Sequence, residues 1–378
     1  MMMLTWFIFA ACVFLIVALL IERILLKRAR EKIRTVIHVN GTRGKSTIVR
    51  LIDAGLRQNS KLQIYSKITG TKPAVIDTQG RLLEIKRRGR ANIKEQVRQL
   101  IKAARQGTEI FIVECMAILP ELQKICEERI LHADILVLSN VRNDHIPEMG
   151  NSLEEVALAF THTFPKEGII FTGEKRYNQL FADMAKAKNS RLIQVELDSE
   201  LTGLESWPPF LRENVALALA VCEELGVERQ AAWAGMKNYL PDPYAFREYA
   251  LPDGAIFANA LTANDPESTG MILDWLLSKE NLQGRQLIIL LNYREDRPAR
   301  TREMLAWAEQ QDVDELWLLG KHKLKQDKSA KKFTHYTSVD KLPLGELKGN
   351  ELIFAVGNVG EAGFQLLHLV EERAIKYV

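Results

Sequence analysis

Residues 40–47, NGTRGKST, carry the residue types and spacing of a phosphate-binding loop. Glycines in such a loop let backbone N–H groups close around a phosphate, and a helix beginning after it supplies further donors. Lys45 is suited to reach the β- and γ-phosphates of a nucleotide, and the Ser46 hydroxyl is suited to hold Mg²⁺. The motif predicts ATP or GTP binding by Asn40, Gly41, Thr42, Arg43, Gly44, Lys45, Ser46 and Thr47.

The segments around this loop match the strand and helix that such a loop requires. Residues 33–39 (IRTVIHV) are predicted to form a buried strand, and residues 45–59 a helix. Val39 stands where the general pattern G-x-x-x-x-G-K-[ST] has its first glycine, so the loop departs from that pattern. The strand–loop–helix context nevertheless favours nucleotide binding over a chance match.

A second predicted strand places a carboxylate where a metal would lie. Residues 110–114 (IFIVE) end in Glu114, and the carboxyl ends of strands are where an open α/β sheet presents its ligands. A carboxylate at that position can coordinate Mg²⁺ beside the phosphate loop. The alternative is an acidic residue that only caps the following helix.

Alternating strand-like and helix-like segments from residue 33 to the end predict an α/β fold with parallel sheets. The clearest break is YLPDPY at residues 239–244, which contains two prolines, and a smaller break is possible within residues 191–209. We therefore expect one transmembrane helix over residues 1–26, a phosphate-loop ATPase domain over residues 27–240, and a smaller C-terminal α/β domain over residues 241–378.

The composition restricts the class of protein. The 378 residues are 47% hydrophobic and 26% charged, which excludes a disordered or fibrous chain. The net charge of +3 gives no global basic field, so we expect no nucleic-acid partner. The cysteines show no C-x-x-C spacing, which excludes a zinc ribbon or disulfide scaffold and fits a reducing compartment. They are Cys12, Cys115, Cys126 and Cys222.

The first 21 residues contain no charged side chain. As a helix they would span about 31 Å, the thickness of a bilayer's hydrocarbon core. Six basic residues follow within residues 22–34, against two acidic ones, so the positive-inside rule predicts an outside N-terminus and cytoplasmic catalytic domains. A cleaved signal peptide or lipoprotein signal would need a basic leading region, and a buried core helix seldom lacks charge for so long. We expect a single-pass anchor in the cell membrane.

The loop sequence N-G-T-x-G-K-[ST]-T resembles that of the Mur ligase superfamily, a group of ATP-dependent amide ligases. Residues 140–145 (NVRNDH) resemble the superfamily signature N-[VI]-x-x-D-H. The resemblance implies that ATP phosphorylates a carboxylate and that an amine then displaces the phosphate. Beside the Mg²⁺ expected at Ser46 and Glu114, it also implies a second Mg²⁺ that His145 helps to hold, although imidazole is an unusual Mg²⁺ ligand, with Asp144 behind it.

The same resemblance assigns two further nucleotide contacts. Asn214, at the start of an amphipathic helix, would read the adenine edge, although an asparagine there is more commonly a cap. Arg247 resembles the linker arginine that contacts the γ-phosphate, so Lys45, Arg247 and His145 are the expected catalytic residues. Asn259 stands where the superfamily carries an aspartate, and its role stays open.

One element of the superfamily is missing from the sequence. Many Mur-type ligases carry a carbamylated lysine in the helix after the D-H motif, where it bridges the metals. Here that segment, residues 154–163 (EEVALAFTHT), contains no lysine, and Lys166 follows too late to substitute. The second metal site is therefore expected to be built differently or to be looser.

The order of segments narrows the resemblance to the ligase subunit of poly-γ-glutamate synthases. Only about a dozen residues separate the expected membrane helix from Asn40, too few for the UDP-binding domain of peptidoglycan ligases. Motifs of the poly-γ-glutamate group follow in order through nearly the whole chain. They are KITGT (67–71), KRRGRANIKEQ (86–96), VECMA (113–117), PDP (241–243), AND (263–265), NYREDRPART (292–301) and AVGNVGEA (355–362).

Basic side chains after a predicted strand of the second domain suit an acidic substrate. Arg294 and Arg297, together with Arg300 or Arg302, can grip carboxylates with paired hydrogen bonds, as glutamate and an acidic polymer require. A solvated charge cluster explains them equally well. Asn264 and Asp265 are also expected at the substrate.

A basic run at residues 86–90 (KRRGR) has no aromatic residues interleaved, which argues against nucleic acid. An anionic polymer or lipid headgroups fit it better, and a plain solvated loop fits best.

These observations predict an ATP-dependent ligase that polymerises glutamate into poly-γ-glutamate through an acyl phosphate. The alternatives are a folylpolyglutamate-like ligase, a membrane-tethered ATPase that powers polymer export, and a nucleotide-regulated binding protein. The expected partners are glutamate, the growing chain, the membrane and other synthase subunits. One of these would be an integral membrane protein, because a single helix provides no conduit for a polyanion.

Overall fold

The computed structural model describes residues 2–70, 72–87, 89–142, 148–197, 201–204, 207–293, 298–321 and 333–377. Contacts between residues divide the chain into two compact units. Unit 1 comprises Met1–Leu201 and Leu211–Leu240, and unit 2 comprises Thr202–Phe210 and Pro241–Val378. Each unit contains its own sheet and its own hydrophobic core, so the two are described separately.

Unit 1 is built on an eight-stranded sheet with the strand order β4-β3-β2-β5-β1-β6-β7-β8. The pairs from β2 to β8 are parallel, whereas β3 is antiparallel to both of its neighbours. The strands are β1 (Thr35–Asn40), β2 (Ile64–Ile68), β3 (Ala74–Ile76), β4 (Leu82–Glu84), β5 (Ile110–Glu114), β6 (Ile135–Leu138), β7 (Ile169–Thr172) and β8 (Arg191–Gln194). All residues of β1 are buried, so this strand crosses the middle of the core.

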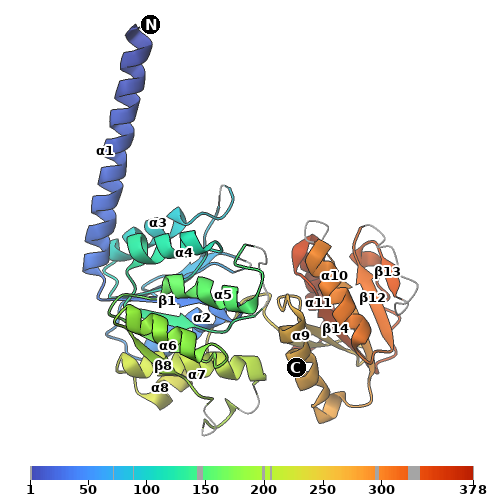
Figure 1. The fold of residues 1–378 in the computed structure, drawn as a ribbon. Helices are drawn as coiled ribbons and strands as arrows, with labels where there is room; N and C mark the ends of the chain where they lie inside the picture. Colours follow the sequence, from blue (N-terminus) through green and yellow to red (C-terminus); the bar gives the residue numbers. More distant parts are fainter. Residues whose placement is uncertain are drawn as a thin grey trace. The chain divides into compact units, whose positions relative to one another are not determined.

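Helices cover both faces of this sheet (Figure 1). On one side α2 packs against α8. The helical segments of unit 1 are α1 (Met2–Lys32), α2 (Lys45–Leu56), α3 (Lys94–Arg105), α4 (Pro120–Ile125), a π-helical segment (Cys126–Leu131), α5 (Leu153–Phe160), a 3₁₀ turn (Thr161–Thr163), α6 (Asn178–Ala187), α7 (Pro209–Glu224) and α8 (Arg229–Met236). The central strand β1 therefore has helical cover and a sheet neighbour on each side, as a buried phosphate-loop strand requires.

Helix α1 projects from unit 1 as a single straight rod (Figure 1). Residues 2–21 are all exposed, and α1 is the one helix in the described chain that is long and apolar enough to cross a membrane. Its last turns are docked, because Ala29 is buried and Arg30 donates to the backbone oxygens of Leu131 and His132. Exposure of the apolar residues excludes a buried core helix and is compatible with a single-pass membrane anchor.

Unit 2 has a seven-stranded sheet with the order β13-β12-β11-β14-β10-β9-β15, parallel except where β9 pairs with β10 and β15. Its strands are β9 (Arg247–Ala250), β10 (Ile256–Asn259), β11 (Gln286–Asn292), β12 (Glu315–Leu319), β13 (Thr334–Tyr336), β14 (Glu351–Val356) and β15 (Lys376–Tyr377). Its helices are α9 (Pro266–Leu277), a 3₁₀ turn (Glu280–Leu282), α10 (Pro298–Gln310), a second 3₁₀ turn (Val339–Lys341) and α11 (Gly360–Arg373).

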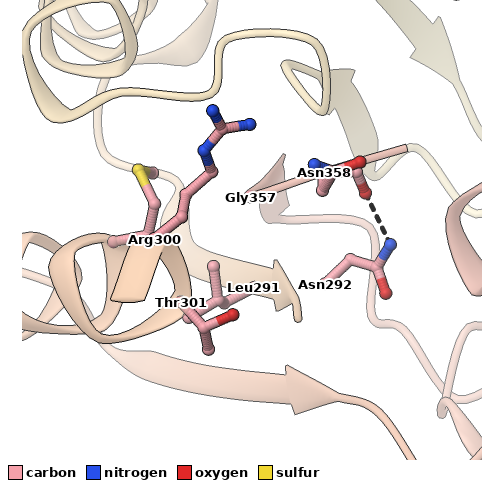
Figure 2. Close-up of a pocket in the computed structure, with 7 residues that line it drawn as sticks. Leu291, Asn292, Arg300, Thr301, Gly357 and Asn358 are labelled. Carbon is pink, nitrogen blue, oxygen red and sulfur yellow. Dashed lines mark hydrogen bonds between the residues drawn. The ribbon is translucent and has the colours of Figure 1, made fainter. Parts of the chain in front are cut away.

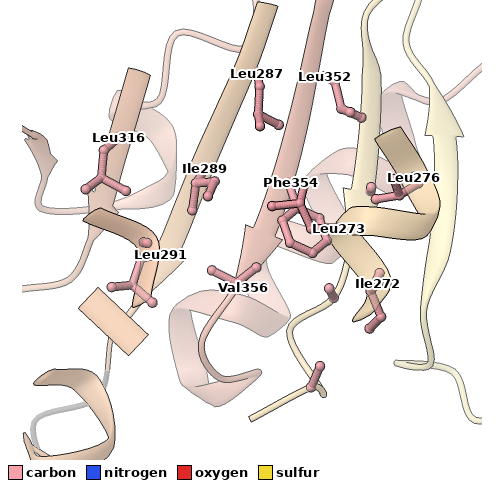
Figure 3. Packing of buried hydrophobic residues seen from close by; sticks show 14 of the residues in the cluster. Ile272, Leu273, Leu276, Leu287, Ile289, Leu291, Leu316, Leu352, Phe354 and Val356 are labelled. Atoms are coloured by element: carbon pink, nitrogen blue, oxygen red, sulfur yellow. The ribbon is translucent and has the colours of Figure 1, made fainter. Parts of the chain in front are cut away.

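Strand β11 is buried on both faces. Leu287, Ile289 and Leu291 pack into a cluster with α9, while Ile288 and Leu290 face a second cluster on the other side. Figure 3 shows the first cluster, in which residues from β11, β12 and β14 meet those of α9. A continuous apolar run of this kind is typical of a central parallel strand. Packing on both faces fixes the position of the carboxyl end of β11.

The predicted α/β class is confirmed, with parallel sheets and one membrane-type helix. The boundaries differ in detail: β1 extends to Asn40, and α2 ends at Leu56 rather than at residue 59. The antiparallel strands β3 and β4 were not predicted, because each has only three residues and β4 is exposed. Short exposed strands carry little hydrophobic pattern.

Candidate active site

The phosphate loop lies between β1 and α2, with β5 and β6 on either side of β1. Gly41 and Gly44 have φ angles of +119° and +85°, which other residues rarely adopt. Asn40 is buried, and its side-chain oxygen accepts a hydrogen bond from the Gly41 N–H at 2.8 Å. Asn40 therefore orients the loop from inside, where its amide also donates to Gln123 and Thr163.

The segment after β6 braces the loop. The Thr42 N–H donates to the Asn140 backbone oxygen at 2.9 Å, and the Arg43 N–H donates to the Asn140 side-chain oxygen at 3.0 Å. A Cβ on Gly41 would lie 2.2 Å from the Ser139 hydroxyl, so the two segments are in tight contact. The motif containing Asn140 thus supports the loop directly.

Lys45 and Ser46 occupy the first turn of α2, where backbone N–H groups are open at a helix start. The Lys45 ammonium donates to the Gly41 and Thr42 backbone oxygens at 2.6 and 3.1 Å, which holds it over the loop. Thr47, the last residue of the motif, is half-buried in the same turn. The ammonium is therefore held against the loop, and its contact with nucleotide phosphates remains a prediction.

The Ser46 hydroxyl donates to the Glu114 carboxylate at 2.9 Å. Glu114 is buried at the end of β5, next to β1 in the sheet. A hydroxyl and a carboxylate in contact are oxygen ligands of the kind Mg²⁺ takes alongside phosphates and water. Within the part of the chain that the structure describes, no cluster of three or more His, Cys, Asp or Glu suited to a metal is found.

The Glu114 carboxylate is aimed by the backbone after β2. The same Oε2 atom accepts from the Thr69 N–H at 2.6 Å and more weakly from the Gly70 N–H at 3.4 Å. Both donors belong to the KITGT motif. This segment therefore sets the position of the candidate metal ligand.

A buried ion-pair network supports that segment. Lys67 is fully buried, and its ammonium lies 2.9 Å from the Glu95 carboxylate and 2.9 Å from the Thr69 hydroxyl. Glu95 also accepts two hydrogen bonds from Arg87, at 2.7 and 2.9 Å. Burial favours the neutral acid, but these bonds and the Lys67 charge outweigh it and lower the pKa of Glu95 to about 2.

The contacts of Arg87 correct one interpretation of the sequence. The run at residues 86–90 was expected to be a solvated loop, yet the Arg87 guanidinium is partly buried and pairs with Glu95. Lys86 and Arg90 are exposed, as expected. The sequence around Arg87 does not indicate this pairing, because the partner Glu95 lies several residues later in the chain and is buried.

The amide of Asn214 lies against the phosphate loop. Asn214 is buried in α7, and a Cβ on Gly44 would lie 2.5 Å from its side-chain oxygen and 2.9 Å from its nitrogen. The residue therefore lies next to the loop. Reading of the adenine edge by this amide remains a prediction.

We expect Gly44→Ala to weaken nucleotide binding at least tenfold. An alanine at this position would have to adopt a left-handed backbone conformation, which costs about 1–2 kcal/mol. Its methyl group would also displace the Asn214 side chain. Titration with a fluorescent ADP analogue measures the effect. Gly107→Ala is the matched control, because Gly107 has φ +72° but open space around it. Equal affinity in both variants would contradict the role of Gly44.

In unit 2, the sequence-predicted residues lie around β9, β10 and the start of α9. Arg247 is half-buried at the start of β9 and pairs in register with Asn259 of β10. Asp265 caps α9 and accepts from the Ser268 N–H and hydroxyl at 2.8 and 2.7 Å. With its amide turned to suit its neighbours, Asn264 donates to the Gly357 and Leu261 backbone oxygens. Substrate contacts by Asn264 and Asp265 remain predictions.

Asn259 has a structural role that explains the missing aspartate. Its buried amide donates to the backbone oxygens of Tyr244 and Ala245 at 3.2 and 3.1 Å, in the segment that leads into β9. Its side-chain oxygen accepts from the Leu261 N–H at 3.2 Å. A carboxylate cannot donate to two carbonyls, so an aspartate would not fit this arrangement.

Asn259→Asp should therefore lower the free energy of unfolding of unit 2 by about 1–3 kcal/mol, because a buried acceptor would face two other acceptors. Denaturant unfolding measures the loss. Asn281→Asp adds the same charge at an exposed position of unit 2 and should change little. Similar stability in the two variants would show that the donated hydrogen bonds are unimportant.

A small hollow, open to solvent, lies at the carboxyl ends of β11 and β14 (Figure 2). Arg300 and Thr301 of α10 line one side, and Asn292 and Asn358 line another. The Asn292 amide donates to the Asn358 backbone oxygen at 2.5 Å, and the Asn292 side-chain oxygen is buried without a partner among the described residues. The hollow is thus lined by an arginine and by a buried amide oxygen.

Four sequence-predicted residues, Asp144, His145, Arg294 and Arg297, lie outside the described residues. The residues that sequence reasoning assigned no role are Lys67, Thr69, Arg87, Glu95 and Asn140. Lys67 had one usable signal, since it is a lysine inside the short strand IYSKI, all of whose residues are buried. A charged residue at such a position requires a partner.

Two family models match the chain. The Mur ligase middle domain matches residues 39–207, which include the phosphate loop and Glu114. The poly-gamma-glutamate synthase CapB C-terminal domain matches residues 246–373, which include the hollow of unit 2.

Two curated relatives and two solved structures extend these matches. The chain is 36% identical over 311 residues to the capsule biosynthesis protein CapB of Bacillus anthracis, covering 79% of the chain but only 65% of that protein. It is 31% identical to the PGA synthase CapB of Bacillus subtilis, covering 98% of the chain and 99% of that protein.

Among solved structures, Escherichia coli FolC in complex with ADP has a TM-score of 0.68 at 17% identity, with 93% of each chain covered. A bifunctional folylpolyglutamate synthase/dihydrofolate synthase with Mn, AMPPNP and L-glutamate has a TM-score of 0.67 at 16% identity, covering 92% of this chain and 93% of that one. At these identities the structures support the fold, whereas the curated relatives and family models define the family. The chain belongs to the CapB family of poly-γ-glutamate synthases, within the Mur ligase superfamily.

Proposed function

We propose that this chain uses ATP and Mg²⁺ to join glutamate units into poly-γ-glutamate through an acyl phosphate. The observation that carries the proposal is the contact of Ser46 with Glu114 beside a phosphate loop that carries Lys45. Family membership supplies the acid and amine substrates, because the Bacillus subtilis relative is named a PGA synthase.

In the proposed reaction, a terminal carboxylate oxygen of the growing chain attacks the γ-phosphorus of ATP, and ADP leaves. The amine of a glutamate then attacks the acyl phosphate, which forms the amide and releases phosphate. Lys45 and the loop N–H groups bind the charge on the transferred phosphoryl group, and Arg247 is assigned to the γ-phosphate. Ser46 and Glu114 would hold Mg²⁺, which neutralises phosphate charge when bound, and His145 is expected to help hold a second Mg²⁺.

The hollow of unit 2 is the proposed place for a substrate carboxylate. Arg300 lines it, and the guanidinium group matches a carboxylate with paired hydrogen bonds. Arg294 and Arg297 follow β11 in the sequence and are proposed to add to this positive charge. Two or three arginines suit a substrate that carries several carboxylates.

The membrane arrangement is part of the proposal. The basic residues after the apolar part of α1 support an outside N-terminus and cytoplasmic catalytic units. Export of a polyanion requires a conduit that one helix cannot form, so we propose that other synthase subunits, including an integral membrane protein, assemble with this chain. Recovery of this chain alone from solubilised membranes would argue against such an assembly.

Hydroxylamine trapping tests the proposed function. Membranes that carry the full chain and its proposed partner subunits receive ATP, Mg²⁺ and glutamate, with hydroxylamine as the competing nucleophile. Formation of glutamyl hydroxamate together with ADP is the expected result. ATP hydrolysis that is indifferent to glutamate and gives no hydroxamate would instead support a motor that powers export, and absence of turnover would support a nucleotide-regulated binding protein.

A further inference from the structure

Helix α3 carries a row of basic side chains along its exposed face. Lys94, Arg98, Lys102 and Arg105 are all exposed, and their spacing of four, four and three residues places them on one side of the helix. The opposite side of α3 is buried in the core of unit 1. We call these four residues the basic stripe.

The positive charge of the basic stripe is largely uncompensated. Within the described parts of the chain, the side chains of Arg98, Lys102 and Arg105 form no ion pair or hydrogen bond, and the Lys94 side chain pairs only with Glu22, at 3.6 Å. Lys86 and Arg90, in the loop before α3, are exposed as well. A row of like charges along a whole helix costs self-repulsion, which a bound anionic surface would relieve.

The contact between α3 and α1 fixes the position of the basic stripe along the axis of α1. Glu22 is the first charged residue after the apolar part of α1, so the Lys94–Glu22 pair sets the start of α3 near the end of the apolar part. Ala29, where α1 becomes buried in unit 1, lies eight residues beyond Ile21, or about 12 Å along the axis. Figure 1 shows α3 on the side of unit 1 from which α1 projects.

We propose that the basic stripe binds anionic phospholipid headgroups and holds unit 1 against the membrane surface. The proposal rests on α1 spanning the membrane. The polar layer of a bilayer extends about 5–8 Å beyond the hydrocarbon core, and lysine and arginine side chains add further reach. The distance from Ile21 to Ala29 therefore brings α3 within contact of headgroups. The polyanionic product is a less suitable partner, because the bilayer itself lies over this face.

The experiment uses the full chain in nanodiscs of phosphatidylcholine, with or without phosphatidylglycerol. A fluorophore is attached at Ala91→Cys, an exposed position just before α3, in a Cys12→Ser background. The remaining cysteines, Cys115, Cys126 and Cys222, are buried. Lipids with a spin label on the headgroup quench the fluorophore only at close range, so quenching reports docking of α3.

Arg98→Gln/Lys102→Gln/Arg105→Gln is compared with the control Lys61→Gln/Lys166→Gln/Lys186→Gln, which removes three exposed charges elsewhere in unit 1. We expect phosphatidylglycerol to increase quenching for the unmodified stripe and for the control. The stripe variant should lose this increase, since each basic residue contributes about fivefold to binding and three contribute about 100-fold.

The proposal would be overturned if quenching changed neither with lipid charge nor with the stripe substitutions. Binding of free poly-γ-glutamate to the chain in phosphatidylcholine nanodiscs that is lost in the stripe variant, with no increase in quenching on addition of phosphatidylglycerol, would identify the polymer as the partner and overturn the proposal as well. Failure of the chain to enter nanodiscs of either composition would overturn the membrane anchor itself. These readouts do not depend on ligase activity, so they are separate from the test of the proposed reaction.

Discussion

Lys45→Ala is expected to reduce glutamate-dependent ADP formation by at least about 100-fold, the loss typical of one charge-stabilising donor in a water-excluded site. The Lys45 ammonium lies over the backbone oxygens of the phosphate loop, where its charge can stabilise a transferred phosphoryl group. Hydroxamate and ADP should therefore fall together. Coupled ADP assays and hydroxylamine trapping measure the two products.

The control for this prediction is Lys61→Ala, an exposed lysine of the same unit. It should leave both products unchanged, while the unfolding midpoint of each variant should stay near that of the wild type. Lys45→Arg should recover little, because a planar guanidinium does not replace a compact ammonium inside a closed loop. Full activity of Lys45→Ala would exclude the phosphate loop as the reacting site.

Glu95→Gln is expected to destabilise unit 1 by about 3–5 kcal/mol, because it leaves the fully buried Lys67 without its counter-charge. It should also raise the Mg²⁺ concentration needed for half-maximal activity, since Lys67 and Thr69 support the backbone that aims Glu114. Denaturant unfolding and a Mg²⁺ titration measure the two effects. Glu84→Gln, an exposed position in β4, is the control.

The double variant Lys67→Met/Glu95→Gln should recover part of the lost stability, since it removes the buried positive charge. The contribution of Glu95 also has a defined pH dependence, because its pKa falls from 4.5 to about 2 on folding. Its stabilisation is complete above pH 4.5 and disappears as the pH falls towards 2. If the difference in free energy of unfolding between the wild type and Glu95→Gln changed between pH 5 and pH 8, this assignment would be contradicted.

The phosphate-loop half of the site could be predicted because its signal is local. Residues 40–47 are consecutive, and the apolar run before them marks a strand that is buried in full. Glu114 could be placed for the same reason, at the end of an apolar run that forms the neighbouring strand. Parallel strands bring their carboxyl ends to one edge, so separate segments meet without any pairing information.

The support of the site could not be predicted, because it depends on partners distant in the chain. Lys67, Arg87 and Glu95 come from a strand, a loop and a helix, and their pairing follows from the fold rather than from spacing. The sequence marked Arg87 as part of a basic run, whereas its contacts show a buried ion pair. Asn259 looked like a missing acid, and only its two carbonyl acceptors reveal why an amide is required.

The chain is an ATP-dependent amide ligase by family. The acyl-phosphate step of the proposed reaction is tested most directly by the fate of the carboxylate oxygen. When a glutamate oligomer and the added glutamate are both labelled with ¹⁸O in their carboxylates and the oligomer is extended with ATP, the account predicts one ¹⁸O atom in the released phosphate for each amide bond formed. Phosphate without ¹⁸O, produced while the polymer grows, would contradict an acyl phosphate and with it the proposed reaction.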